Sequence, residues 1–384
     1  MPPLARQHFP TTRSWAYLNH AGICPLPQPA VDAMLRRAQE TSVDGEYTYE
    51  RHKSDNERIR AQGARLMGVP ADDVAFIKNT TEGLGFVANG LSWSPGDRVV
   101  IPDGEFPSTL YPWLALQEQG VRVDRVTPAG PGGALPVEAF ERVIRQGPPP
   151  KVVVTSWVQF GTGWRVDLPA LAEVCADVGA LLCADVIQGL GVVPAELERW
   201  GVDFAMADGH KWLLGPTGSG LLYVRGRHLG RLRPLEPGWN AVRHREDWDN
   251  PHLDYDPTAR RLEGGMPIMG GIAALGASLD LLLEASVEAV WRHVDALCEH
   301  ACEELAEAGA TILSDRSAQT RSGIVSFSLG GLDPQAAALV LRTRGIACSA
   351  RSGALRISPH GYNTHEEIDR LTAEVRLLTA SSAR

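Results

Sequence analysis

The segment from Leu181 to Tyr223 decides the fold of this chain, and it reads LLCADVIQGLGVVPAELERWGVDFAMADGHKWLLGPTGSGLLY. One apolar run ends abruptly at Asp185, and a second, Phe204 to Ala207, leads into the sequence DGHK, which ends at Lys211. Short apolar runs between glycine-rich turns are typical of buried parallel strands. Because ligands of open α/β sheets bind at the carboxyl ends of such strands, we expect Asp185 and Lys211 to meet at one site.

Lys211 is one of only four lysines among the 37 basic residues. An arginine cannot be deprotonated in a protein, whereas a partly buried lysine can lose its proton and attack a carbonyl. The retention of lysine here favours a Schiff-base lysine. The alternative is an ordinary lysine on a loop at the end of a strand.

Asp185 bears on this choice, because a carboxylate at the end of an apolar strand is costly unless a cation meets it. Pyridoxal phosphate needs such a carboxylate, since a protonated ring nitrogen makes its ring an electron sink. Gln188, three residues further on, can hydrogen-bond the phenolic oxygen of that ring.

The pattern D-x-x-Q, followed by G-H-K and G-P-x-G, resembles the class V aminotransferase family over about residues 15–380. That family includes cysteine desulfurases, selenocysteine lyases, kynureninases and isopenicillin N epimerase-like enzymes. The resemblance implies a fold-type-I pyridoxal phosphate enzyme of the α/β class. Its large domain is a doubly wound, mainly parallel sheet, and a smaller α+β domain follows at the C-terminus.

The resemblance also implies a role for each residue at these two strand ends. Lys211 binds the cofactor and, once freed, shuttles the Cα proton of the substrate. Asp185 keeps the ring nitrogen protonated and Gln188 tunes the phenolic oxygen. Asp208 contacts the cofactor, while His210 holds its phosphate and belongs with the catalytic residues.

A short predicted strand leads through the sequence NTTE (79–82) into a predicted helix over residues 83–90. The free N–H groups at a helix N-terminus bind phosphate, and threonine hydroxyls add donors. Taken alone, the segment is more simply a capping box. The resembling family uses its T-T-E segment to bind the cofactor phosphate, which implies that role for Thr80, Thr81 and Glu82.

Phe106 departs from the pattern of the cysteine desulfurases, which have E-H-x-A here with the histidine stacked on the pyridine ring. A phenyl ring can stack on the cofactor in that place but cannot relay protons. Without the resemblance, a core phenylalanine is an equal alternative. Val158 stands near the position of a common desulfurase asparagine, and whether Gln159 replaces that asparagine is open.

Arg356 lies in a short apolar strand, where a guanidinium needs a bidentate anionic partner. Its place in L-R-I-S-P-H-x-Y-N-T matches the family arginine that holds the α-carboxylate of the substrate, the alternative being a structural ion pair. Arg351 fits a solvated loop arginine better than a second anion-binding group. Asn19 and His20 are further candidates for substrate contact, with a structural role for His20 equally open.

Length and composition limit the number of domains, the possible partners and the location of the protein. A chain of 384 residues favours two domains, which we place at 15–260 and 261–384, with residues 1–14 expected to pack on the second. The net charge of −9 argues against nucleic acid or an anionic membrane as a partner. No apolar run reaches the roughly 18 residues of a membrane span, and the first residues lack a signal-peptide core. Six cysteines without disulfide-scaffold spacing indicate reduced thiols and a cytoplasmic location.

The sequence RLEGGMP (261–267) resembles the family segment R-x-E-x-G-T-P. In the family this segment reaches across a homodimer to the phosphate of the other subunit through its threonine. Met266 stands in place of that threonine, so the side-chain contact is in doubt while backbone donors remain. A homodimer with residues 263–267 near the partner's site is therefore implied.

Other classes of protein fit less well. A nicotinamide enzyme would need G-x-G-x-x-G at its first βα turn, and the G-P-T-G-S-G at 215–220 lacks the G-K-[ST] ending of a phosphate-binding loop. The HEE sequence at 365–367 lacks H-E-x-x-H spacing, so no metal site is expected. A non-catalytic binding or regulatory protein of this fold would be expected to lose Lys211, Asp185 or Arg356, and all three are present.

The reaction at the α-carbon of the amino-acid substrate is the most open point. Desulfurases carry a mobile-loop cysteine well ahead of the carboxylate arginine, whereas Cys348 lies only eight residues before Arg356. This spacing disfavours desulfuration through an enzyme persulfide. Transamination, β-elimination from a cysteine derivative and racemisation or epimerisation remain. Transamination is narrowly preferred because it needs no extra nucleophile, and C–S lyase activity is second.

Overall fold

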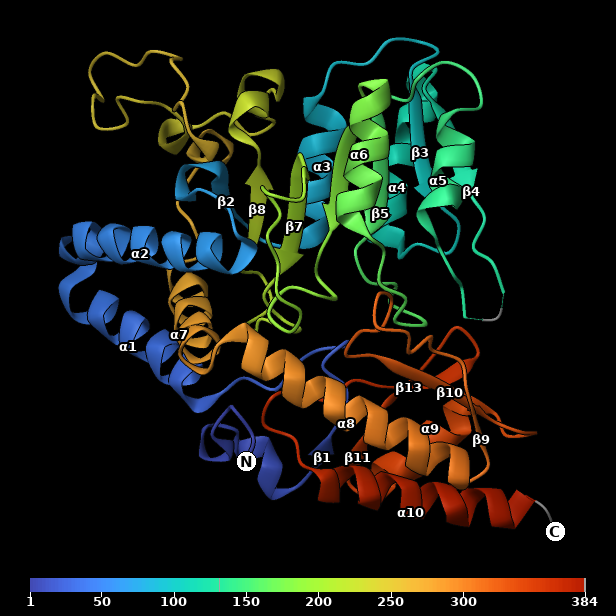
Figure 1. The fold of residues 1–384 in the computed structure, drawn as a ribbon. Helices are drawn as coiled ribbons and strands as arrows, with labels where there is room; N and C mark the ends of the chain where they lie inside the picture. The colour runs from blue at the N-terminus through green and yellow to red at the C-terminus, as the bar shows by residue number, and fades with distance from the viewer. Residues whose placement is uncertain (131, 383–384) are drawn as a thin grey trace.

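Seven strands form the central sheet of the computed structural model, which describes residues 1–130 and 132–382 (Figure 1). Their order is β2-β8-β7-β6-β5-β3-β4. The strands are β2 (Val74–Ile77), β3 (Arg98–Pro102), β4 (Arg122–Val126), β5 (Val152–Ser156), β6 (Leu181–Asp185), β7 (Phe204–Asp208) and β8 (Gly220–Val224). The pairs from β7 to β4 are parallel, whereas β8 runs antiparallel to β7 and β2. The predicted mainly parallel sheet is confirmed.

Both faces of this sheet are buried, which explains why its strands are continuous apolar runs in the sequence. In β5, Val153 belongs to one apolar cluster, and Val152 and Val154 belong to a second cluster on the opposite face. Helices cover each face, so the sheet is doubly wound as predicted. They are α5 (Val137–Ile144) and α6 (Leu168–Val178) on the first face, and α3 (Thr80–Gly90) and α4 (Pro107–Ala115) on the second.

Helix α4 follows β3 after a short connection. The helix begins at Pro107, directly after Phe106, which has extended backbone and is the N-cap residue. Proline is well tolerated at this position because the first N–H groups of a helix have no intrahelical partner. The helix places Thr109 beneath the end of β6, where its hydroxyl reaches Asp185.

The C-terminal part of the chain forms a four-stranded antiparallel sheet with the order β12-β13-β10-β9. The strands are β9 (Ala310–Ile312), β10 (Val325–Leu329), β12 (Ser349–Arg351) and β13 (Ala354–Ile357). The helices of this part are α7 (Met269–Ala285), α8 (Val287–Glu307), α9 (Pro334–Thr343) and α10 (His365–Ser382). Figure 1 shows α7 and α8 below the large sheet, with α10 at the foot of the molecule.

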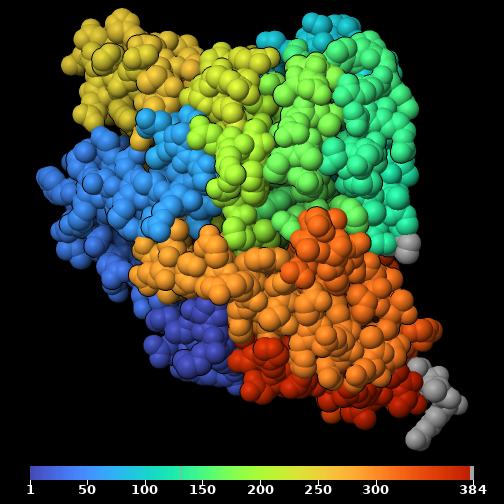
Figure 2. All heavy atoms as spheres, in the orientation of Figure 1, coloured from blue at the N-terminus to red at the C-terminus, as the bar shows by residue number. Residues whose placement is uncertain are grey.

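The first residues of the chain lie against its C-terminal part, as the contact between dark blue and red in Figure 2 shows. Strand β1 (Ala16–Tyr17) pairs in parallel with β11 (Ile346–Ala347), and the N–H of Leu4 donates to the carbonyl of Gly361 at 3.0 Å. The next helices, α1 (Gln28–Asp44) and α2 (Tyr49–Met67), pack on α7 (Figure 1). The domain boundary at residue 260 stays a prediction.

Among the described helices, none is by itself long and apolar enough to cross a membrane. Helices α7 and α8 meet the length and composition criterion only as a pair, and the pair is bent by 80°.

Candidate active site

A pocket of about 240 Å³ lies where β6 and β7 end and α3 begins. The predicted site residues that line it are Thr80, Thr81, Phe106, Asp185, Gln188, Asp208, His210, Lys211 and Arg356. Residues from four separate regions of the sequence therefore meet at one place, at the carboxyl ends of parallel strands. Asn19, His20 and Glu82 were also predicted to lie at the site, and they do not line this pocket.

Lys211 carries the amine of the site, and no salt bridge reaches it from the described residues. Burial lowers the pKa of Lys211 to about 8, with Arg356 and Arg351 adding to the lowering and Asp185 opposing it. An amine with this pKa has a sizeable neutral fraction near pH 7 to 8, and the neutral form is the nucleophile. The surroundings of Lys211 thus fit covalent capture of an aldehyde.

Asp185 is only 4% exposed at the end of β6. Its Oδ2 accepts from the Thr109 hydroxyl at 2.8 Å, and its Oδ1 accepts from the N–H of Ile187 at 3.0 Å. Burial raises the pKa of Asp185, and Lys211 is among the groups that oppose this change. Both hydrogen-bond donors are neutral, so the carboxylate remains suited to a protonated ring nitrogen.

Gln188 is fixed in orientation at both ends of its amide. Its Nε2 donates to the carbonyl of Ala21 at 3.0 Å, and its Oε1 accepts from Nε1 of Trp212 at 3.0 Å. An amide nitrogen has two N–H donors, so one remains for a group in the pocket. This arrangement fits the predicted hydrogen bond to a phenolic oxygen.

Three groups can hold a phosphate beside the N-terminus of α3. Thr80 accepts from the N–H of Asp208 through Oγ1 at 3.2 Å, and the Thr81 hydroxyl donates to Oγ of Ser108 at 2.8 Å. Nδ1 of His210 lies 2.7 Å from Oδ2 of Asp208, so a protonated His210 has its Nε2–H available for an anion. The first N–H groups of the helix add further donors.

Glu82 is part of the helix cap and does not face the phosphate position. One carboxylate oxygen of Glu82 accepts from the N–H of Lys78 at 2.6 Å, and the other lies 3.0 Å from the Lys78 ammonium. Its own N–H donates to the side chain of Asn79 at 2.9 Å. The capping-box interpretation of this segment therefore describes Glu82, while its neighbours Thr80 and Thr81 line the pocket.

Phe106 faces the amine of the site, because the centre of its ring lies 5.7 Å from Nζ of Lys211. Its side chain is 44% exposed, so it is not a core phenylalanine. Glu105, directly before it, is buried and accepts from the N–H of Ser156 at 2.7 Å and from Nε2 of Gln159 at 2.9 Å. Gln159 is thereby turned away from the pocket and does not take the place of the desulfurase asparagine.

Arg356 is a buried cation without an anionic partner. Its side chain is 1% exposed, Nη1 donates to the carbonyl of Phe160 at 2.5 Å, and Nε has no hydrogen-bond partner. Burial lowers the pKa of Arg356 to about 10, with Arg351 adding to the effect. No described acidic residue forms an ion pair with Arg356, which removes the structural alternative. A carboxylate entering the pocket would satisfy it.

Neither His20 nor Asn19 lines the pocket. His20 is fully buried, and its two ring nitrogens lie 2.9 Å from the Ser358 carbonyl and 2.9 Å from the Tyr362 hydroxyl. Both nitrogens are therefore used in joining the N-terminal segment to the C-terminal one. Asn19 forms a β-bridge with Ser358 beside it. Of the two roles left open for His20, the structure favours the structural one.

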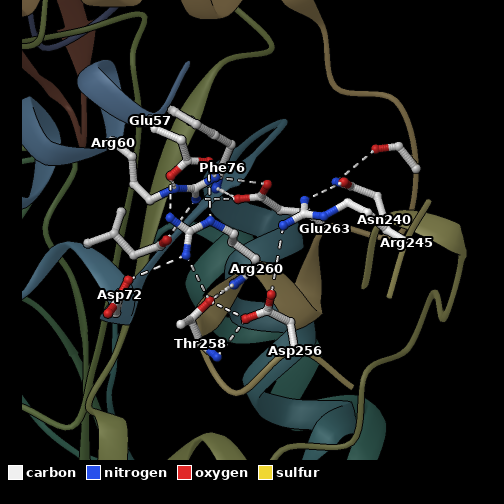
Figure 3. A network of polar contacts seen from close by, with 12 residues as sticks. Glu57, Arg60, Asp72, Phe76, Asn240, Arg245, Asp256, Thr258, Arg260 and Glu263 are labelled. Carbon is white, nitrogen blue, oxygen red and sulfur yellow. Dashed lines mark hydrogen bonds and ion pairs between the residues drawn. The ribbon is translucent and has the colours of Figure 1, made fainter. Parts of the chain in front are cut away.

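Ion pairs fix Glu263, within the segment expected to approach a partner subunit, to the rest of the protein (Figure 3). Glu263 accepts from Arg60 at 2.5 and 3.1 Å and from the N–H of Phe76 at 2.8 Å. Arg260, directly before this segment, pairs with Glu57. Met266, just beyond, is 60% exposed. The homodimer itself stays a prediction.

Comparison with known proteins gives a consistent result. The family model described as aminotransferase class-V matches residues 16–371. A probable cysteine desulfurase of Methanothermobacter thermautotrophicus is 31% identical, covering 95% of this chain and 95% of that protein. The uncharacterized aminotransferase YcbU of Bacillus subtilis is 29% identical, covering 99% of this chain and 98% of its own length.

Two solved structures are also similar. The cystine C–S lyase C-DES, in complex with its product cysteine persulfide, has a TM-score of 0.89 at 23% identity, covering 96% of this chain and 99% of C-DES. The apo cysteine desulfurase of Thermococcus onnurineus has a TM-score of 0.88 at 24% identity, covering 98% of this chain and 97% of its own. At this identity the likeness shows the fold, and it confirms the predicted fold type.

Proposed function

The chain belongs to the class V aminotransferase family, and on that premise we propose that it is a pyridoxal-phosphate-dependent C–S β-lyase acting on a cysteine derivative. The family predicted from the D-x-x-Q and G-H-K motifs is thereby confirmed. Pyridoxal phosphate is its cofactor, and a C-DES variant similar in fold carries glycine covalently linked to that group. The pocket fits it, with an amine of low pKa, a buried carboxylate, phosphate donors and an unpaired arginine.

The preference for transamination is replaced by its first alternative. The relatives named cysteine desulfurase and the structural neighbour named cystine C–S lyase all break a carbon–sulfur bond. One relative is named an aminotransferase, but it is uncharacterized. The comparisons therefore support lyase activity better than transamination.

The observation that carries this proposal is the lack of a thiol among the residues lining the described pocket. Cys348 is partly buried, and burial raises its pKa to about 12. Because the thiolate is the sulfur nucleophile, a thiol of this kind is a poor persulfide acceptor. The sulfur of the substrate then leaves as a small molecule.

The overall reaction is R–S–CH₂–CH(NH₃⁺)–COO⁻ + H₂O → RSH + pyruvate + NH₄⁺. The Cβ–S bond breaks, the Cα proton is removed, and the sulfur leaves with the bonding electron pair and gains a proton. No outside oxidant or reductant is needed. Pyridoxal phosphate, when bound, supplies the electron sink that makes the Cα proton acidic.

Each of the predicted site residues has a role in this reaction. Arg356 orients the α-carboxylate through charge-assisted hydrogen bonds. Lys211 first holds the cofactor, and its freed Nζ then takes the Cα proton and can return one to the departing sulfur. Asp185 holds a proton on the ring nitrogen, and Thr80, Thr81 and His210 bind the phosphate. Phe106, whose ring lies 5.7 Å from Nζ of Lys211, would pack against the bound cofactor and has no group that could transfer a proton.

The test is product analysis with the cofactor-loaded enzyme. We expect S-alkyl-L-cysteines or L-cystine to give pyruvate and ammonium in equal amounts, together with a thiol or persulfide. Lys211→Ala should abolish turnover, and Cys348→Ser should retain it. Conversion of the cofactor to its pyridoxamine form during turnover, or loss of activity in Cys348→Ser, would contradict the proposal.

A further inference from the structure

Three apolar side chains from separate segments line the mouth of the pocket. They are Ile23, Phe106 and Phe160, which we call the apolar wall. Ile23 is 59% exposed and Phe106 is 44% exposed, although both belong to a pocket. The two phenylalanine rings meet edge to face with 5.4 Å between their centres. Exposed apolar side chains gathered at a ligand pocket indicate a surface that a ligand covers.

The backbone behind this wall is held by hydrogen bonds. The Tyr17 hydroxyl donates to the carbonyl of Ile23, and the N–H of the next residue, Cys24, donates to the carbonyl of His210 at 2.8 Å. The carbonyl of Phe160 accepts from Arg356 at 2.5 Å. The wall is therefore positioned before any ligand arrives, which favours selectivity.

The wall also adjoins the groups that bind the amino acid. The carbonyl of Phe160 accepts a hydrogen bond from Arg356, and the centre of the Phe106 ring lies 5.7 Å from Nζ of Lys211. An amino acid with its carboxylate on Arg356 and its Cα beside Lys211 thus lies next to this pair of touching rings. Its side chain beyond Cβ extends along the apolar wall toward solvent.

We propose that the apolar wall selects cysteine derivatives whose sulfur carries an apolar substituent, namely S-alkyl or S-aryl cysteines. This inference rests on the proposed C–S lyase function and names its substrate class. A cystine would instead place a second ammonium and carboxylate against these apolar groups, and such polar groups are costly to desolvate without partners. Arg351 also lines the pocket, but its Nη1 donates to the adjacent Ala350 carbonyl at 2.8 Å.

The experiment uses S-methyl-, S-ethyl- and S-propyl-L-cysteine with the cofactor-loaded enzyme. Their thiolate leaving groups are chemically alike, so differences in kcat/KM report contacts made by the substituent. We expect kcat/KM to rise about fourfold per methylene, the factor that corresponds to about 0.8 kcal/mol. In Ile23→Ser the rise in kcat/KM should fall to below about twofold per methylene. Leu339→Ser, at a residue of α9 that is 53% exposed and does not line the pocket, should leave it unchanged.

A second measurement separates this inference from the proposed reaction. L-2-Aminobutyrate, L-norvaline and L-norleucine have no leaving group, and their binding can be followed through the absorbance of the cofactor. Tighter binding along this series with no pyruvate from any cysteine derivative would support the wall and refute the lyase function. Pyruvate release with a kcat/KM that does not depend on the length of the S-alkyl substituent would refute selection by the apolar wall. It would leave the proposed lyase function unchanged. A preference for L-cystine that disappears in Arg351→Gln would also refute selection by the apolar wall.

Discussion

Replacing Arg356 by methionine should make the protein more stable and its substrate binding weaker. The side chain of Arg356 is 1% exposed, and its one hydrogen bond in the described structure goes to the carbonyl of Phe160. Burial lowers its pKa to about 10, well below the usual arginine value. The free protein thus keeps a charge in an environment that disfavours it, a common feature of residues selected for function.

The magnitude follows from this pKa change. Each pKa unit is worth about 1.4 kcal/mol, so keeping Arg356 charged costs the folded state about 3 kcal/mol. The folded pKa lies below the unfolded one, so the cost applies in full below about pH 10 and fades as the pH rises toward 12.5. Methionine removes that cost but also the bond to Phe160, worth about 1 kcal/mol. At pH 7 we expect a net gain of about 2 kcal/mol.

Urea denaturation of the cofactor-loaded proteins, without amino acid, measures this difference. Arg98→Met is the matched control, because Arg98 is equally buried at 2% exposure but lies 2.6 Å from Asp124. Its loss should destabilise the fold by about 3–5 kcal/mol, since it removes the ion pair with Asp124 and leaves the carbonyls of Val143 and Pro148 without their donor. Arg351→Met, at an exposed residue, should change stability by less than about 0.5 kcal/mol.

Whereas Arg356→Met should increase stability, it should weaken substrate binding. Truncating one partner of a buried charge pair costs about 2–5 kcal/mol, so KM for the amino acid should rise about 30- to 4,000-fold in Arg356→Met. If Arg356→Met were destabilised as much as Arg98→Met, Arg356 would have an anionic partner in the free protein. The assignment of Arg356 to the substrate carboxylate would then be refuted.

Three further predictions concern the cofactor and the fold. The rate at which apo-protein takes up pyridoxal phosphate should rise through pH about 8, and an inflection near 10.5 would contradict the low pKa of Lys211. Asp185→Asn should weaken cofactor binding by about 10- to 100-fold in equilibrium dialysis, because a charge-assisted hydrogen bond is lost; unchanged affinity would remove Asp185 from the site. Glu263→Gln should lower the free energy of unfolding by about 1.5–3 kcal/mol, because buried Arg60 loses one of its two carboxylate partners and keeps Glu57; Glu246→Gln, at a surface ion pair, should leave it nearly unchanged.

The sequence predicted the site best where a residue type is favoured at only one kind of position in the fold. A buried parallel strand is an apolar run, and its end is where a functional polar residue follows. Asp185 and Lys211 could therefore be assigned to one site from the order of residues alone. The place of Arg356 at the pocket was predictable for a related reason, since a guanidinium in an apolar strand needs an anion, while its contact with a substrate carboxylate stays a prediction.

Side-chain direction could not be predicted in the same way. His20 lies near the pocket in sequence, yet it turns into a buried cluster with Tyr362, a contact made 342 residues away along the chain. Glu82 lies beside two pocket-lining threonines, yet it folds back to Lys78 because a helix N-terminus needs a cap. Thr109 was missed because nothing in its sequence surroundings indicates that α4 brings it to Asp185. Each of these depends on tertiary contacts that local sequence does not encode.

The electrostatics of the pocket suggest why Arg356 is left unpaired in the free protein. Its charge helps to lower the pKa of Lys211 to about 8, which favours the neutral amine that captures the cofactor. When the carboxylate of a substrate binds Arg356, that charge is neutralised, and the pKa of a freed Lys211 must rise. A higher pKa makes Nζ a stronger base at the moment when the Cα proton has to be removed. A permanent acidic partner for Arg356 would abolish this coupling, because the charge would be neutralised whether or not substrate is present.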